Sequence, residues 1–337
     1  MAPRPIYVYF EPEPSGAHPR KNWLLGLGDE HGFDGCARAE SRDEADWCLL
    51  ASLWNDFVGA GEMDKLEALN DALRGGPRLL VWVWGDEEVI NPFDNTVVLQ
   101  SGTNRRRFDT NLREVPYPVG DPVEAWFGGV WHPASVYSLP TVAFCGRGGY
   151  GPVARPKSKL STLTSRYRAR HRFFRPADDG YRVLRGRELA HLENSTRVVA
   201  DVHAFDHFGG GIHVDPGQTE LKAKVWFINN LRANVCGFCV WEAGNFSARF
   251  YECLACGRIP VLVDTDAVFQ GAGHIDWERT VILVGADDRD RIDERVVSFH
   301  ESLSPEELTA RQAECHQLWE DHLSSVRFAR DLARHLL

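Results

Sequence analysis

Short, unbroken apolar runs alternate along the chain with longer segments whose apolar residues recur every three or four positions. The runs at residues 6–10, 79–84 and 96–99 have the length and composition of buried strands, and a further apolar run covers 47–53. Residues 62–73 are predicted to form a helix with one apolar face made of Met63, Leu66, Leu69 and Leu73. This alternation of strands and helices predicts an α/β fold built on parallel strands.

Prolines and glycines punctuate residues 116–140 more densely than any other stretch, so we predict a domain boundary there. The same pattern restarts after it: strands are expected at 141–145, 233–240 and 259–263, and helices at 221–231 and 248–256. Ser304, Pro305 and Glu307 form a helix-start signal, with an N-cap, a proline at the first helical position and a capping-box glutamate. The predicted units are an N-terminal domain (1–137), a C-terminal domain (138–310) and a C-terminal helical segment (311–337).

Overall charge and apolar run length narrow the classes of partner. The 337 residues carry 38 Lys and Arg against 48 Asp and Glu, a formal net charge of −10. No nucleic-acid partner is therefore expected. No apolar run approaches the roughly 18 residues that a membrane-spanning helix needs, and the first residues lack the apolar region of a signal peptide. We expect a cytoplasmic protein with no transmembrane segment, whose eight cysteines are reduced.

Local charge departs from this acidic average. Residues 147–187 contain twelve Lys or Arg against two acidic residues, Asp178 and Asp179. Such a run fits a bound anion, and equally a solvated surface with scattered basic residues.

Two C-x-x-C pairs, Cys236–Cys239 and Cys253–Cys256, match the ligand spacing of a zinc site. The first pair lies in a predicted strand, where residues three apart point to opposite faces, and the second lies on an apolar helix face. We therefore expect four reduced core cysteines and no bound metal.

A glycine-rich segment follows the predicted strand at 141–145. Residues 146–151 fit G-x-G-x-x-G, a pattern whose backbone N–H groups approach a diphosphate. Pro152 and Pro156 delay the next helix, and no acidic residue suited to a nicotinamide ribose follows about twenty positions later. The segment thus favours a phosphate-binding loop, with a nicotinamide-dependent oxidoreductase as the alternative.

Asp264 and Asp266 form a D-x-D pair just after the strand at 259–263. Such a pair can chelate a divalent cation. At the end of a strand, however, aspartates commonly stabilise turns and helix starts, and we predict that role here.

Residues 245–252 carry the most chemistry. Asn245 or Ser247 can cap a helix that begins at Ala248, which would leave its free N–H groups above the strand ends. Arg249 lies in the first turn, where a cation is unfavourable unless an anion binds beside it, and Glu252 offers two acceptors for the hydroxyls of a ribose. The alternative for Arg249 and Glu252 is a surface ion pair, which stabilises a helix by only about 0.2–0.5 kcal/mol.

These residues belong to a longer pattern. Arg249-Phe250-Tyr251-Glu252, Leu254-Ala255, Gly257, Ile259-Pro260-Val261 and Ile275-Asp276-Trp277 resemble the signature of the exostosin family of inverting glycosyltransferases. Residues 41–47 resemble an acidic stretch of that family, and Phe144, Gly146 and Arg147 resemble the opening of its second domain. The resemblance covers residues 140–300 clearly and residues 1–137 weakly.

The resemblance implies a GT-B fold, in which two Rossmann-like domains face a central cleft and a C-terminal helix packs back toward the N-terminal domain. It also implies that the nucleotide-sugar donor binds the C-terminal domain and the acceptor mainly the N-terminal domain. It implies transfer of a hexose or pentose, with inversion, from a nucleoside-diphosphate sugar, typically UDP-linked, to a glycan or glycoconjugate. No metal cofactor is expected. Arg249 would contact the donor diphosphate and Glu252 the ribose. Family members usually have a Pro-Arg-Gly-like stretch where this chain has Glu242, so Arg147 or another residue of the basic run at 147–187 is the expected replacement phosphate contact. The expected donor-binding set is Gly146, Arg147, Gly244, Asn245, Ser247, Arg249 and Glu252.

The resemblance implies a role in polysaccharide biosynthesis. Because the sequence shows neither the acceptor-domain motif nor the membrane anchor of plant and animal members, we expect a soluble, cytoplasmic bacterial or viral enzyme. The catalytic base is expected in the N-terminal domain, where Glu13 and Asp86 follow predicted strands and His31 is a third candidate. Each of the three also fits a solvated loop residue. A further alternative is a degenerate, non-catalytic transferase that only binds glycans.

Overall fold

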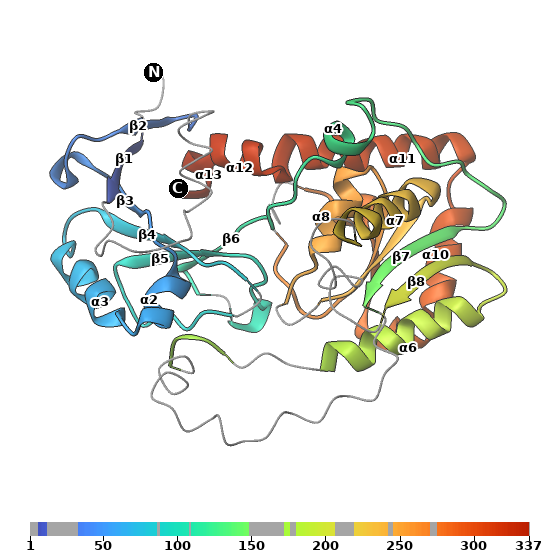
Figure 1. Ribbon diagram of the computed structural model, residues 1–337, viewed down its shortest axis with the longest axis horizontal. Coiled ribbons are helices and arrows are strands. Elements are labelled where there is room, and N and C mark those ends of the chain that lie inside the picture. Colours follow the sequence, from blue (N-terminus) through green and yellow to red (C-terminus); the bar gives the residue numbers. More distant parts are fainter. Residues whose placement is uncertain are drawn as a thin grey trace.

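The computed structural model describes residues 6–11, 33–85, 88–107, 109–147, 172–175, 180–205, 219–241, 245–269 and 275–336 (Figure 1). Two sheets, one of six strands and one of five, contain only parallel strand pairs and are flanked by helices. The predicted α/β class is confirmed, and the arrangement is compatible with two Rossmann-like units. Among these residues, no helix is long and apolar enough to cross a bilayer.

The N-terminal sheet has the strand order β2-β1-β3-β4-β5-β6. Its strands are β1 (Ile6–Glu11), β2 (Cys36–Arg38), β3 (Trp47–Leu50), β4 (Arg78–Trp82), β5 (Thr96–Gln100) and β6 (Leu112–Glu114). The four central strands, β1, β3, β4 and β5, coincide with the apolar runs singled out in the sequence, and their register places their carboxyl ends at one edge of the sheet. In open parallel sheets that edge is where ligands bind.

Side-chain alternation divides the N-terminal sheet between two cores. Leu79 and Val81 of β4 face a core that includes residues of α2 (Trp54–Ala60) and α3 (Met63–Ala72). Leu80 and Trp82 face the opposite core, which α12 (Ser325–Arg330) and α13 (Leu332–Leu336) complete with Phe328 and Leu332. The C-terminal helices therefore pack back onto the N-terminal sheet, as expected.

The second sheet has the order β11-β10-β9-β7-β8. Its strands are β7 (Thr141–Arg147), β8 (Val199–Phe205), β9 (Cys236–Cys239), β10 (Ile259–Val263) and β11 (Ile282–Val284). After β7 the chain adds β8 on one side and then returns past β7 to add β9 on the other. This reversal creates a topological switch point between β7 and β9, and a crevice opens at the carboxyl edge of a sheet at such a point.

Helices cover both faces of the second sheet. In Figure 1, α7 (Thr219–Ala233) and α8 (Ala248–Ala255) lie on one face, and α6 (Gly180–Asn194) and α10 (Ile292–Glu301) lie on the other. This arrangement follows from right-handed crossovers at a sheet whose strand order reverses. The remaining helices include α4 (Pro122–Trp126), α9 (Trp277–Thr280), η5 (Ala286–Arg291), α11 (Pro305–Leu318) and the π-helical η6 (Trp319–Leu323).

The predicted start of α11 is confirmed in detail. Ser304 Oγ accepts from the backbone N–H of Glu307 at 3.2 Å, while Glu307 Oε2 accepts from the N–H of Ser304 at 2.7 Å. This reciprocal capping box fixes the point where the chain leaves the second unit and turns toward the N-terminal sheet.

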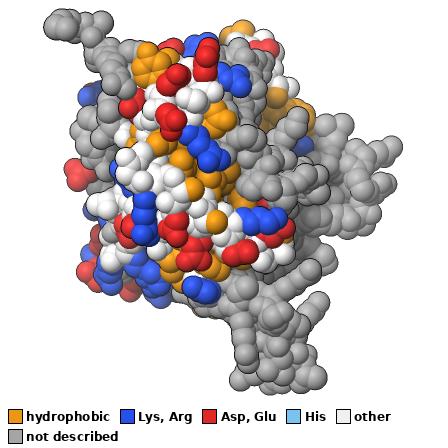
Figure 2. All heavy atoms as spheres, turned by 90° about the vertical axis from the view of Figure 1, so that its left-hand side faces the viewer, with side chains coloured by type: hydrophobic (Ala, Val, Ile, Leu, Met, Phe, Trp, Pro, Cys, Tyr) orange, Lys and Arg blue, Asp and Glu red, His pale blue; other side chains and the backbone are white. Residues whose placement is uncertain are grey.

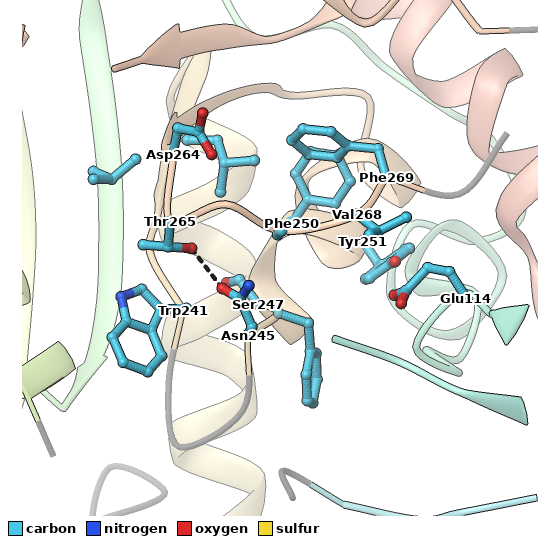
Figure 3. Close-up of a pocket in the computed structure, with 14 residues that line it drawn as sticks. Glu114, Trp241, Asn245, Ser247, Phe250, Tyr251, Asp264, Thr265, Val268 and Phe269 are labelled. Carbon is cyan, nitrogen blue, oxygen red and sulfur yellow. Dashed lines mark hydrogen bonds between the residues drawn. The ribbon is translucent and has the colours of Figure 1, made fainter. Parts of the chain in front are cut away.

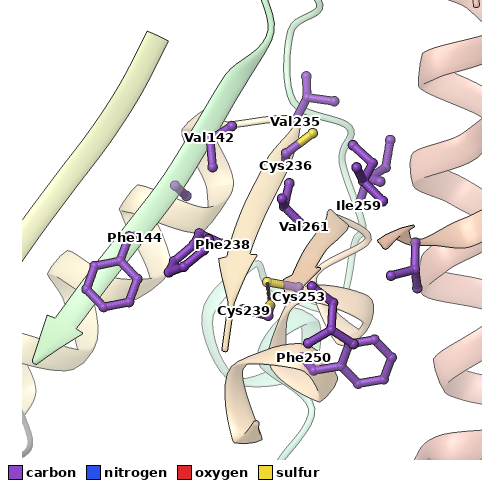
Figure 4. Packing of buried hydrophobic residues seen from close by; sticks show 14 of the residues in the cluster. Val142, Phe144, Val235, Cys236, Phe238, Cys239, Phe250, Cys253, Ile259 and Val261 are labelled. Atoms are coloured by element: carbon purple, nitrogen blue, oxygen red, sulfur yellow. Dashed lines mark hydrogen bonds between the residues drawn. The ribbon is translucent and has the colours of Figure 1, made fainter. Parts of the chain in front are cut away.

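The four cysteines of the C-x-x-C pairs are free and buried in the core of the second sheet (Figure 4). The sulfurs of Cys239 and Cys253 lie 3.7 Å apart between β9 and α8. A Cβ at Gly237 would lie 2.3 Å from Cys253 Sγ, so the absence of a side chain at residue 237 allows α8 to pack closely on β9. The predicted role of the four cysteines as core side chains is confirmed.

One short segment crosses between the units. Residues 172–175 pack on the N-terminal sheet, where Phe173 and Phe174 join the core of Trp54 and Phe93. The backbone of Phe174 also forms a bridge with Val89. The segment lies between β7 and α6 in the sequence, but it packs in the core that α2 and α3 form with the N-terminal sheet.

Candidate functional site

Arg249 lies across the carboxyl end of β7, at the switch point of the second sheet. It comes from the first turn of α8, and its Nη2 donates to the backbone carbonyl of Cys145 at 2.6 Å. A Cβ at Gly146 would lie 2.6 Å from the same nitrogen. Two residues predicted as donor contacts, separated by about a hundred positions, are therefore in contact here.

Aromatic rings hold the Arg249 guanidinium in place. Its Cζ lies 4.3 Å from the ring centre of Phe144 and 5.6 Å from that of Phe227. Its Nε is buried and has no hydrogen-bond partner among the residues that the structure describes. Cation–π contacts hold the guanidinium through its face and do not use the Nε–H donor. The Nε–H therefore remains available for an anion.

Glu252 lies one turn further along α8 and is partly buried. Burial raises the pKa of the Cys145 thiol to about 11; the charge of Arg249 opposes this rise, and the charges of Asp201 and Glu252 add to it. The charges of Arg249 and Glu252 therefore both affect the Cys145 thiol at the end of β7. The two α8 residues predicted to contact the donor thus lie near the same strand end.

Asn245 and Ser247 line a small neighbouring pocket of about 30 Å³ that opens to solvent (Figure 3). Asn245 Oδ1 accepts from Thr265 Oγ1 at 2.7 Å, while Asn245 Nδ2 is buried and has no partner among the described residues. A buried amide donor without a partner costs free energy, which a ligand acceptor would recover. Trp241 lies on one side of Asn245 in the pocket, and Glu114 lies on the other.

Helix α8 begins at Ala248, as predicted, with Ser247 in the N-cap position. The predicted side-chain cap is wrong, because neither Ser247 nor Asn245 caps the helix through its side chain: Ser247 makes no cap hydrogen bond, and Asn245 pairs with Thr265 instead. The first N–H groups of the helix are thus not taken up by a side-chain cap.

Glu114, at the end of β6, was missed by the sequence analysis. Its two carboxylate oxygens accept from the N–H groups of Gly102 and Thr103 at 2.7 and 2.8 Å. Burial raises the pKa of Glu114 to about 8, although those N–H groups oppose the rise. No sequence signal marked it, because its strand, β6, was not predicted and its partners lie on a loop eleven to twelve positions away.

The loop held by Glu114 joins the two units. Thr103 accepts from the N–H of Val268 at 2.9 Å, and the N–H of Arg105 donates to the carbonyl of Asp266 at 2.8 Å. A Cβ at Gly102 would lie 2.7 Å from a ring carbon of Phe246. The 102–105 loop of the N-terminal unit therefore lies directly against the segment that leads into α8.

A second cavity, of about 540 Å³, lies where this loop meets the end of β10. Arg105 fills part of its wall: Nη2 lies 2.8 and 2.7 Å from the oxygens of Asp264, and Nε lies 3.2 Å from Asp266 Oδ1. Asp264 Oδ1 also accepts from the N–H of Asp266 at 2.8 Å. The predicted turn role is confirmed for Asp264, and the carboxylates of both Asp264 and Asp266 are ion-paired with Arg105.

Several predicted site residues fall outside the described residues. These are the three candidate bases Glu13, Asp86 and His31, together with Gly244 and all of the glycine-rich segment beyond Arg147. Arg147 itself ends β7 beside Gly146. Within the described ranges, no group of three or more His, Cys, Asp or Glu side chains is arranged to hold a metal ion.

The described geometry places Gly146, Arg249 and Glu252 at the switch point and Asn245 and Ser247 in the adjoining pocket. Comparison of the chain with models of known protein families and with curated proteins gave no match.

Proposed function

We propose that this chain is a metal-independent glycosyltransferase of GT-B architecture that transfers a sugar, with inversion, from a nucleoside-diphosphate sugar to a glycan or glycoconjugate. The observation that carries the proposal is the contact between Arg249 and Gly146. It places a guanidinium, with a buried and unused Nε, over the switch-point crevice of a parallel sheet.

The neighbouring groups fit a nucleotide. Diphosphate oxygens suit Arg249 and the first N–H groups of α8, and Glu252 has the acceptors that ribose hydroxyls need. The unused amide of Asn245 lies in the adjoining pocket and offers a further donor. The resemblance of residues 249–261 to the exostosin signature favours a UDP-linked donor.

The reaction we infer is a single displacement. A base of the N-terminal unit removes the proton of an acceptor hydroxyl, whose oxygen attacks the anomeric carbon while the bond to the diphosphate breaks. Arg249 and the α8 N-terminus stabilise the charge that develops on the leaving diphosphate. Glu13, Asp86 and His31 remain the candidates for the base.

Turnover tests this proposal. Purified protein is incubated in EDTA with UDP-, GDP- and dTDP-sugars and a panel of glycan acceptors, and nucleoside diphosphate release is measured. The anomeric configuration of the product is then read by NMR. We expect release that depends on an acceptor and a product of inverted configuration. A product of retained configuration, or no release with any donor, would contradict the proposal.

Matched variants distinguish loss of donor binding at the site from loss of the folded structure. Arg249→Ala and Glu252→Ala should abolish most turnover while the variants remain folded. Arg295→Ala is the control, since this half-exposed arginine of α10 pairs only loosely with Asp288, at 3.8 Å. Equal activity of Arg249→Ala and Arg295→Ala would remove Arg249 from the site.

A further inference from the structure

The cavity between the two units has an excess of positive charge. Its walls include four arginines, from the loop after β5 and from η5, and two aspartates; the charged lining residues are Arg105, Arg106, Arg107, Arg289, Asp264 and Asp266. The whole chain has a net charge of −10, and on the face seen in Figure 2 acidic and basic side chains are interspersed. The arginine-rich cavity therefore differs in charge from the chain as a whole, and packing of the fold does not by itself require this clustering.

The arginines differ in how far their charges are compensated. Arg105 is held by both aspartates, and Arg107 pairs with Glu88 at 2.9 Å. Among the described residues, Arg106 pairs only with Asp266, at 3.4 Å, a carboxylate that Arg105 already uses, and its side chain is 87% exposed. Asp264 and Asp266 thus compensate the charges of Arg105 and Arg106, while the charge of Arg289 interacts with the carboxylate of Glu188.

Arg289 lies at the inner wall of the cavity. Its Nη2 donates to the backbone carbonyl of Asp264 at 3.0 Å, a neutral acceptor. Its Nε is buried and has no hydrogen-bond partner among the residues that the structure describes. An unused buried donor on a cation is satisfied by an anionic oxygen, and guanidinium groups match carboxylate, sulfate and phosphate geometry.

We propose that this arginine cavity binds an acidic group, a carboxylate, sulfate or phosphate, on the acceptor substrate, with Arg106 and Arg289 as its contacts. The assignment of that group to an acceptor rests on the proposed function. Trp241 and Thr265 line both this cavity and the pocket of Asn245, so an acceptor bound here lies beside the donor. The cavity also borders the N-terminal unit through Arg105–Arg107, the side from which the acceptor is expected.

The test uses charged and neutral sugars as probes. The protein is first saturated with UDP, so that the donor diphosphate site is filled, and is then titrated calorimetrically with glucose 6-phosphate, glucuronate and glucose. We expect both anionic sugars to bind about 10-fold more tightly than glucose, and raised salt to reduce the difference. Anionic sugars that bind no better than glucose would overturn the proposal.

Two variants locate the binding. Arg106→Gln and Arg289→Gln should each weaken the anionic sugars by about 3- to 10-fold and leave glucose and UDP affinity unchanged. Arg106→Gln should fold normally because its side chain lies in solvent. The control is Arg74→Gln in the turn after α3, an exposed arginine that pairs with Asp71 and Asp94.

The outcomes separate this proposal from the one it rests on. If Arg106→Gln weakens UDP as much as it weakens the anionic sugars, the cavity serves the donor diphosphate and the acceptor assignment is wrong. If wild-type protein binds anionic sugars through Arg106 but binds no nucleoside diphosphate, the anion site stands and the proposed transferase function fails.

Discussion

The guanidinium of Arg249 occupies the space that a side chain at position 146 would need, because a Cβ there would lie 2.6 Å from Nη2. The clashing atom is the far end of a flexible side chain, so the fold can accommodate a methyl group by moving the guanidinium. The position of the Arg249 guanidinium therefore depends on the absence of a side chain at residue 146.

Gly146→Ala should displace Arg249 without unfolding the protein. We predict that nucleoside diphosphate affinity falls about 10- to 100-fold, as in Arg249→Ala, because each change removes the same charged contact. The double variant should lose no more than either single variant. Calorimetric titration of all three checks this prediction. Gly59→Ala is the control, since its Cβ would meet nothing within 4 Å. Additive losses would show that the two residues act separately.

Arg105 should stabilise the contact between the two units. Its pairing with Asp264 and Asp266 flanks the backbone contacts made by Thr103 and Val268. We predict that Arg105→Ala speeds amide exchange at Arg105 and Val268 by about 2- to 10-fold, because a charged pair at this contact is lost. Hydrogen exchange read by mass spectrometry measures this. Arg107→Ala, which breaks only a pair with Glu88, should leave both amides unchanged.

Glu114 should make stability fall as pH rises. Its folded-state pKa of about 8 lies above the usual carboxyl value, so between these values the folded protein binds more protons than the unfolded chain. The stabilising effect of protonation is fully present below about pH 4 and is lost as pH rises through 8. Glu114→Gln cannot ionise, so the difference in unfolding free energy between wild type and variant should change over this window. A constant difference from pH 5 to 9 would contradict the prediction.

Arg258 should be essential for stability. Its side chain is fully buried, and it donates to the carbonyls of Leu231 and His132, both at 2.9 Å, and to Gln312 Oε1 at 2.8 Å. We predict that Arg258→Met costs about 2–4 kcal/mol, because these acceptors lose their partner in the interior. Urea denaturation measures the change. Arg74→Met, at an exposed site, should stay within about 0.5 kcal/mol of wild type.

The hydrophobic pattern predicted the central strands and missed the edges. The run at 259–263 matches β10 residue for residue because both faces of that strand are buried. The four strands that no prediction covered are β2, β6, β8 and β11, and each lies at the edge of its sheet. Edge strands are short or carry polar residues on an open side, as Asp201 and His203 do in β8, so an unbroken apolar run does not mark them.

The sequence also predicted the part of the site that lies within one helix start. Asn245, Ser247 and Arg249 lie where the residues around Ala248 predicted them. The sequence did not predict contacts between distant parts of the chain. Arg105 and Asp264 are 159 positions apart, and neither the three consecutive arginines nor the D-x-D pair indicates which residues it will contact. Such pairings depend on how two sheets meet, which local patterns do not encode.

The central claim is that the switch-point crevice binds a nucleoside diphosphate through Arg249 without a metal. It is tested most directly by calorimetric titration of UDP, GDP, dTDP and NADH into the wild type and Arg249→Ala, in EDTA and again with magnesium. We predict that one nucleoside diphosphate, UDP, binds wild type equally in both conditions and binds Arg249→Ala at least about 10-fold more weakly. Binding only with magnesium, or binding of NADH alone, would contradict the claim.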